Sequence, residues 1–176
     1  MEGREWAKQP RVSILHAQGA QNLLTGSQFR HRIGGTGGNL AVILVAEDNP
    51  ADVYLIREAL REYAVECTIR VAADGQELLG LISADNPEVP DLIILDLNLP
   101  RHDGIEILQR IKQTSEFAHT RVVVLTSSDS PRDRKRATEL GATRYLCKPS
   151  SLEQFLALGA VFRDLLATGA RGAAGE

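Results

Sequence analysis

The sequence lacks any hydrophobic run long enough to cross a membrane. Its longest apolar stretches, Leu40–Ala46 and Leu92–Leu95, are far shorter than the roughly 20 residues of a membrane-spanning helix. The first residues also lack the basic-then-apolar pattern of a secretion signal. We therefore expect a cytoplasmic protein with no membrane segment.

Cysteine is almost as scarce. The two cysteines, Cys67 and Cys147, form no C-x-x-C pair and have no pair of histidines nearby. This pattern argues against a disulfide framework and against a zinc site, so it predicts two reduced, buried thiols.

Positive charge is in short supply in the body of the chain. The net charge is −3, but residues 1–38 hold five basic side chains against two acidic ones, which leaves −6 for the rest. Because nucleic-acid binding needs many basic residues to neutralise phosphates, we expect no nucleic-acid partner. The basic run at 132–136 is typical of a solvated helix face, and as a functional surface it favours an acidic protein partner or a homodimer contact.

The chain is predicted to divide into a leader, one folded domain and a tail. Its 176 residues, 43% of them apolar, are enough for one buried core. Residues 1–38 show no strand or helix period and end in a glycine run, which predicts a flexible leader. The run lacks the Lys-Ser/Thr that completes a phosphate-binding loop. The folded domain is predicted over 39–167 and a flexible tail over 168–176.

From Leu40 on, short apolar runs alternate with segments of helical period, which is typical of an α/β protein with βα units around a parallel sheet. The predicted strands are 41–46, 67–72, 91–96, 121–126 and 144–147. The predicted helix N-caps are Asn49 with Asp52 in the first turn, Asp74, Ser130 and Ser150. Gly141 is predicted to end the fourth helix. The helix positions predicted to face the core are Val53, Ile56, Leu60, Tyr63, Phe155, Leu158, Phe162 and Leu165.

Charged and hydroxyl side chains end four of the five predicted strands. They are Glu47 and Asp48 at the first strand, Asp96 at the third, Thr126 at the fourth and Lys148 at the fifth. In an open parallel sheet, sites form beyond the carboxyl ends of the strands. We therefore expect these side chains to meet at one edge.

Converging carboxylates repel one another unless a cation lies among them, and a small, hard ion such as Mg²⁺ suits oxygen ligands. We predict that Asp48 and Asp96 bind Mg²⁺ directly and that Glu47 binds it through water. A backbone carbonyl just after Asp96, which we assign to Asn98, would help to complete the octahedron.

With the metal in place, Asp96 can act as the nucleophile toward a phosphoryl group. Lys148 would then offset charge on the phosphoryl oxygens, and the hydroxyl of Thr126 would donate to one of them. Taken singly, Lys148 is typical of a surface lysine and Thr126 of a strand former. The prediction therefore depends on the combination.

Residues 40 to about 166 resemble the receiver domains of response regulators. The resemblance rests on Glu47-Asp48, Asp96 with Pro100 and Asp103-Gly104 behind it, Thr126, and Lys148-Pro149. The segments 47–52, 96–100 and 124–128 look like the single-domain regulators associated with phytochrome kinases. The resemblance implies a flavodoxin-like, doubly wound (βα)5 fold with strand order 2-1-3-4-5.

The resemblance also implies a function in a two-component phosphorelay. Asp96 would accept a phosphoryl group from a sensor histidine kinase, and a downstream protein would receive the signal. Thr126 and Tyr145 would turn inward and remodel the face of the fourth helix, fifth strand and fifth helix. The alternative for Tyr145 is an aromatic residue half-buried on its strand. In this family the bond between Lys148 and Pro149 is typically cis.

Three other classes of protein fit the sequence less well. Haloacid-dehalogenase-like phosphatases also use an aspartate nucleophile and Mg²⁺, but they need a second aspartate two residues on, where Asn98 stands; we expect no enzyme. A degenerate receiver that serves only as a binding platform would not need the complete set of site residues. A transcription factor needs an output domain, and the 28 residues after Lys148 leave room for only one helix.

Overall fold

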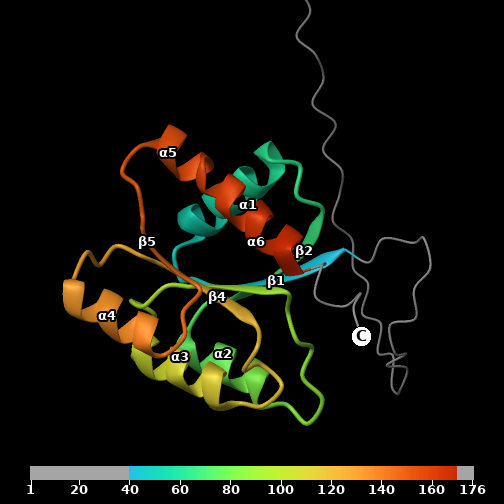
Figure 1. The fold of residues 1–176 in the computed structure, drawn as a ribbon, viewed down its shortest axis with the longest axis vertical. Helices are drawn as coiled ribbons and strands as arrows, with labels where there is room; N and C mark the ends of the chain where they lie inside the picture. Colours follow the sequence, from blue (N-terminus) through green and yellow to red (C-terminus); the bar gives the residue numbers. More distant parts are fainter. Residues whose placement is uncertain (1–39, 170–176) are drawn as a thin grey trace, which may run out of the picture. The chain divides into compact units, whose positions relative to one another are not determined.

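The structure is a computed structural model that describes residues 40–169. The predicted leader, 1–38, and most of the predicted tail lie outside the described residues. No helix within 40–169 is long and apolar enough to cross a membrane. Figure 1 shows one central sheet with helices on both sides of it.

Five parallel strands form the sheet in the order β2-β1-β3-β4-β5, which confirms the predicted fold class and strand order. The strands are β1 (Ala41–Ala46), β2 (Cys67–Ala72), β3 (Leu92–Leu95), β4 (Arg121–Thr126) and β5 (Arg144–Cys147). Four of the five have the predicted bounds. The third is one residue shorter at each end than the predicted 91–96. At its start, Val42 N donates to the side-chain carboxylate of Asp91, 2.8 Å away, where a regular ladder uses a backbone carbonyl.

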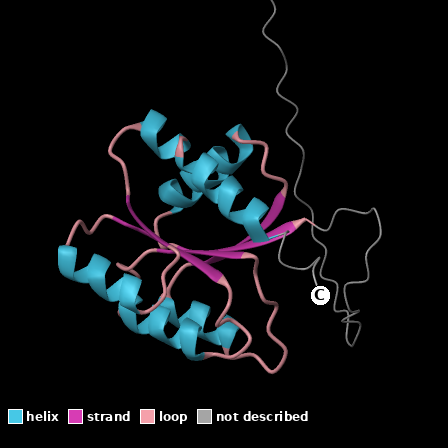
Figure 2. Cartoon of the chain, in the orientation of Figure 1, coloured by secondary structure: helices cyan, strands magenta, loops and turns pink. Residues whose placement is uncertain are grey.

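Two groups of helices cover the two faces of the sheet (Figure 2). The helices α1 (Pro50–Glu62), α5 (Leu152–Leu156) and α6 (Leu158–Gly169) lie on one face, and α2 (Gly75–Ile82), α3 (Gly104–Gln113) and α4 (Pro131–Glu139) lie on the other. Alternation along β1 serves both sides, since Ile43 and Val45 pack under α1 and α6 while Leu44 and Ala46 pack under α2 and α3. The two core layers together hold the sheet edge in place.

The predicted caps and core positions are mostly confirmed. Asn49, Asp74 and Ser130 cap their helices, and Gly141 follows α4 with a φ of 88°. The cap of α5 is Ser151 and not Ser150, because Ser151 accepts from Gln154 N one residue further on. The predicted core positions, except Tyr63, belong to or pack against the core between the sheet and the helices α1, α5 and α6. Tyr63 is half-buried, and the guanidinium of Arg163 lies over its ring.

The single helix predicted after Lys148 is interrupted at Ala157. There Ala160 N donates to Ala157 O, and this i→i+3 hydrogen bond of the 3₁₀ type marks the junction between α5 and α6. At the start of α6, a Cβ on Gly159 would lie 2.1 Å from the carbonyl oxygen of Ala59 on α1. Only glycine permits this approach. The helix then continues to Gly169, so residues 168 and 169, which we predicted to belong to the tail, are helical.

We predict opposite effects for two glycine-to-alanine changes. Gly159→Ala should lower the free energy of unfolding by roughly 1–3 kcal/mol, because its Cβ collides with α1 backbone. Gly80→Ala is the matched control in α2, where a Cβ meets nothing within 4 Å, so it should raise stability by about 0.5–1 kcal/mol. Denaturant unfolding measures both. Equal changes in the free energy of unfolding would contradict the close contact between Gly159 and α1.

Candidate functional site

Glu47 and Asp96 emerge side by side from neighbouring strands. Ala46 on β1 pairs with Leu95 on β3, so the residues that follow them stand level. The hydrogen-bond ladder continues one step beyond the strands, with Asp96 N donating to Ala46 O and Glu47 N donating to Ala72 O, each over 3.0 Å. The sheet therefore fixes the backbone of both acidic residues at the point between β1 and β3 where the strand order reverses.

Three carboxylates meet at this edge. Oxygen atoms of Glu47, Asp48 and Asp96 lie within 4.8 Å of one another. Glu47 and Asp96 are buried, with 3% and 4% of their surface exposed, while Asp48 is exposed. Because like charges that close are unfavourable away from water, this donor set calls for a cation.

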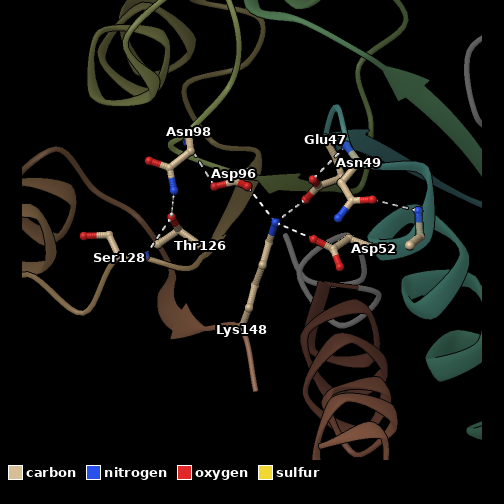
Figure 3. Close-up of polar contacts among 9 residues, drawn as sticks. Glu47, Asn49, Asp52, Asp96, Asn98, Thr126, Ser128 and Lys148 are labelled. Atoms are coloured by element: carbon tan, nitrogen blue, oxygen red, sulfur yellow. Dashed lines mark hydrogen bonds and ion pairs between the residues drawn. The ribbon is translucent and has the colours of Figure 1, made fainter. Parts of the chain in front are cut away.

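Lys148 supplies positive charge at the centre of the site (Figure 3). Its backbone N–H donates to Thr126 O over 2.8 Å, which extends the β4–β5 ladder past Cys147. Its Nζ lies 2.6 Å from Asp96 Oδ2, 2.8 Å from Glu47 Oε2 and 2.8 Å from Asp52 Oδ2. One ammonium group thus contacts three carboxylates, one on α1 and two that directly follow β1 and β3.

Burial and these ion pairs act on the pKa values in opposite directions. Burial by itself lowers the pKa of Lys148, but the hydrogen bonds to Asp52, Asp96 and Glu47 outweigh it and raise that pKa well above its ordinary value. Burial also raises the pKa of Glu47, although Lys148 and the backbone N–H of Asn49 offset part of the rise. Even with Lys148 beside it, the pKa of Glu47 therefore stays above its ordinary value.

The three clustered side chains offer carboxylate oxygens as metal ligands, and these are the ligands that Mg²⁺ prefers. Glu47, Asp48 and Asp96 are the only group of three or more acidic, histidine or cysteine side chains with this spacing in residues 40–169. The predicted metal ligands are therefore brought together. The role predicted for the carbonyl of Asn98 stays a prediction.

Asp52 belongs to the site and was missed as a site residue. In the sequence it looks like an ordinary acidic residue in the first turn of a helix. The structure directs its carboxylate to Lys148, and the side chain of Asn49 alone caps α1 by accepting from Ala51 N. No sequence signal distinguished it, because an aspartate in the first turn is equally well explained by helix capping or by the helix dipole.

A second set of hydrogen bonds connects Asp96 to β4. Asn98 N donates to Asp96 Oδ1 over 3.0 Å, and Asn98 Nδ2 donates to Thr126 Oγ1 over 3.2 Å. Ser128 N donates to the same hydroxyl oxygen over 3.3 Å. Both lone pairs of the fully buried Thr126 hydroxyl are thereby used. Its proton is the part left to donate to a group beside Asp96.

The Asp103-Gly104 motif shapes the loop that follows Asp96. Asp103 Oδ1 accepts from Ile105 N over 2.8 Å and caps α3. A Cβ on Gly104 would lie 2.3 Å from the Cα of Leu97, so a larger residue would push this loop outward. The motif therefore keeps the acceptor loop close to the site.

Tyr145, the predicted switch residue, is buried on β5 with 8% of its surface exposed. Its hydroxyl donates to Ser128 O over 3.0 Å. The guanidinium of Arg134 lies 4.6 Å from the ring centroid and donates to Tyr145 O over 3.0 Å. Arg134 was predicted to lie on a solvated basic face, and it is exposed, as are Arg132 and Arg136. Its guanidinium also contacts Tyr145 on the edge strand β5, which the sequence did not predict.

The bond between Lys148 and Pro149 is trans, which contradicts the cis bond that the family resemblance implied. All peptide bonds in the described part of the chain are trans. Trans is the intrinsically favoured isomer of a bond to proline by about 0.5–1 kcal/mol. Lys148 reaches the carboxylates with this isomer.

Comparisons with known proteins agree with this geometry. A family model described as the response regulator receiver domain matches residues 43–158. The chain is 36% identical over 116 residues to response regulator Rcp1 of Synechocystis sp., a match that covers 64% of this chain and 79% of Rcp1. It is 38% identical over 121 residues to response regulator MprA of Mycolicibacterium vanbaalenii, covering 65% of this chain and 47% of MprA. The chain thus spans less than half the length of that second relative.

Solved structures give the same result. The phosphorylated cyanobacterial phytochrome response regulator RcpA matches with a TM-score of 0.68 and 32% identity, over 74% of this chain and 96% of that one. The Mn²⁺-bound form of response regulator Rcp1 matches with a TM-score of 0.65 and 33% identity, over 70% of this chain and 92% of that one. Both the general resemblance and the closer likeness to phytochrome regulators are confirmed.

We predict that Glu47→Gln stabilises the metal-free protein at neutral pH. Because the folded-state pKa of Glu47 is raised, the folded protein holds this proton to higher pH than the unfolded chain does. The charged side chain therefore costs stability once the pH exceeds the ordinary value of 4.5. Thermal unfolding in EDTA should show a higher melting temperature for Glu47→Gln at pH 7, with a difference that shrinks toward pH 4.5.

Added Mg²⁺ should reverse that order, since the variant has lost one carboxylate of the cluster. A melting temperature in EDTA at pH 7 that is lower for Glu47→Gln than for the wild type would contradict the interpretation. It would mean that the ion pair with Lys148 outweighs the burial of Glu47.

Proposed function

The chain belongs to the response regulator receiver family, and we propose that it is a response regulator whose Asp96 accepts a phosphoryl group from a sensor histidine kinase. The observation that carries the proposal is the environment of Asp96. Its Oδ2 lies 2.6 Å from the ammonium of Lys148, and the carboxylates of Glu47 and Asp48 lie close enough to share a cation with it. Relatives solved in a phosphorylated and in a Mn²⁺-bound form support the same chemistry here.

The proposed reaction is an in-line phosphoryl transfer. A carboxylate oxygen of Asp96 forms a bond to phosphorus while the P–N bond of the phosphohistidine breaks, and the electron pair of that bond stays on the imidazole nitrogen. Lys148 places positive charge beside the phosphoryl oxygens. The Thr126 hydroxyl oxygen already accepts two hydrogen bonds, so its proton is free to donate to a phosphoryl oxygen.

Mg²⁺ is the proposed cofactor. Glu47, Asp48 and Asp96 would hold it, together with the backbone at Asn98. When bound, it reduces the repulsion between the attacking carboxylate and the phosphoryl group. The burial of Glu47 and Asp96 supports this assignment, because buried carboxylates are stabilised by a divalent cation.

The proposed output runs from Thr126 to Tyr145 through the backbone of Ser128. Ser128 N donates to the Thr126 hydroxyl, and Ser128 O accepts from the Tyr145 hydroxyl. A movement of Thr126 toward a phosphoryl oxygen would pull on this connection and shift Tyr145. The surface of α4, β5 and α5 would then differ between the two states, and the phosphoryl group can bias them only by its different interaction energy in each.

This output requires protein partners. We propose a cytoplasmic signalling protein, not an enzyme, with a sensor histidine kinase as phosphoryl donor and a downstream protein as target. The exposed side chains Arg132 and Arg136 on α4 suit an acidic partner surface or a second copy of the chain.

We predict that a small acyl phosphate adds one phosphoryl group to the wild type when Mg²⁺ is present and none when EDTA replaces it. Asp96→Asn should gain nothing, because an amide oxygen is too weak a nucleophile, whereas the exposed control Asp164→Asn should behave like the wild type. Intact mass spectrometry measures the gain. Phosphorylation of Asp96→Asn would contradict the assignment of the acceptor. No gain in the wild type would favour a receiver that acts only as a binding platform.

A further inference from the structure

Asp52 is a fourth carboxylate at the site, and it differs from the other three. It lies in the first turn of α1 with its side chain 19% exposed, and its Oδ2 is 2.8 Å from Lys148 Nζ. It is absent from the group of three carboxylates spaced to share a cation. Figure 3 shows it reaching Lys148 from the α1 side, away from Asp96. Among the described residues, 40–169, the Asp52 carboxylate accepts a hydrogen bond from Lys148 alone.

The local structure of α1 frees Asp52 for this contact. At a helix start, an acidic residue in the third position normally reaches back to the N–H of the capping residue. Here that residue is Asn49, and its N–H donates instead to Glu47 Oε1 over 3.1 Å. Glu47 has therefore taken over the local role, and Asp52 can turn its carboxylate toward Lys148.

We propose that Asp52 is a positioning residue that holds Lys148 in place during phosphoryl transfer. The inference rests on the proposed function and adds a residue to its machinery. Lys148 has three carboxylate partners in the structure. In the proposed reaction Asp96 gives up its carboxylate charge when it becomes an acyl phosphate, and Glu47 would share its charge with the cation that the three carboxylates could hold. Asp52 is the one partner that neither event removes.

A lysine needs such a partner more than an arginine does. Its ammonium sits on a flexible four-carbon chain and can donate in any direction, so its position depends on what surrounds it. Without Asp52, the only carboxylate partners of Lys148 among the described residues would be Asp96 and Glu47. Lys148 would then compete with the cation for the same oxygens, or swing away from the phosphoryl group. A fixed carboxylate on α1 prevents both movements.

The ordinary alternative is that Asp52 only stabilises α1, as acidic residues in a first turn do through the helix dipole. The two explanations differ in their dependence on Lys148. A contribution to helix stability is independent of the lysine, whereas a positioning role disappears when the lysine is removed.

The experiment compares Asp52→Ala and Asp52→Asn with the wild type at saturating Mg²⁺. Asn keeps an oxygen that can accept from Lys148, and Ala does not. Glu62→Gln is the control, because it removes one exposed acidic group from the same helix. The rate of phosphorylation by an acyl phosphate is followed by intact mass, and thermal unfolding is recorded for each variant. The same Asp52→Ala change is then made in Lys148→Ala.

We expect Asp52→Ala to slow phosphorylation by about tenfold, with Asp52→Asn and Glu62→Gln within about threefold of the wild type. In the Lys148→Ala background, Asp52→Ala should change the rate by less than about twofold. A wild-type rate in Asp52→Ala would overturn the inference, and so would an equal loss in Asp52→Asn, which would indicate charge and not position. If the wild type itself gains no phosphoryl group, the proposed function fails first, whatever the Asp52 variants do.

Discussion

The ammonium group of Lys148 lies within hydrogen-bonding distance of three carboxylates, and the acidic edge of the sheet depends on this shared interaction. Two of the three, Glu47 and Asp96, are almost completely buried. Burying a carboxylate without a partner costs several kcal/mol. The lysine offsets much of that cost but leaves Glu47 with a raised pKa. The three closely spaced carboxylates at this edge are the reason for proposing a cation there.

The parallel sheet makes this concentration of charge possible. Each strand ends at the same edge, and the hydrogen-bond ladder extends one residue past β1, β3 and β5, so the sheet holds the backbones of Glu47, Asp96 and Lys148. The loop after Asp96 is kept close by Gly104, which has no space for a side chain beside Leu97. The sheet thus positions the backbones of the site residues, and the ion pairs position their charged side-chain ends.

Much of this could be predicted from the sequence, because periodicity and strand ends are local signals. Apolar runs located the strands, and the polar residues after them located Glu47, Asp48, Asp96, Thr126 and Lys148. The contacts that depend on tertiary distances could not be predicted. Asp52 and Lys148 are 96 positions apart, and no pattern in either segment announces their contact. The contact of Arg134 with Tyr145 likewise exists only once α4 packs beside β5.

Smaller differences have equally local causes. Ser150 and Ser151 are each followed three residues later by Glu or Gln, so both match a capping box. In the structure Ser151 is the N-cap. The break at Ala157 reflects the close approach of α6 to α1, which composition does not reveal.

The most direct test of this account is the effect of Lys148→Ala on stability and on Mg²⁺ binding, with the exposed Lys135→Ala as control. Without Mg²⁺, Lys148→Ala should lose about 3–5 kcal/mol of unfolding free energy, because it leaves buried carboxylates unpaired. It should also bind Mg²⁺ more tightly than the wild type, since the competing charge is gone. Unchanged stability in EDTA together with unchanged or weaker Mg²⁺ binding would contradict the central role given to Lys148.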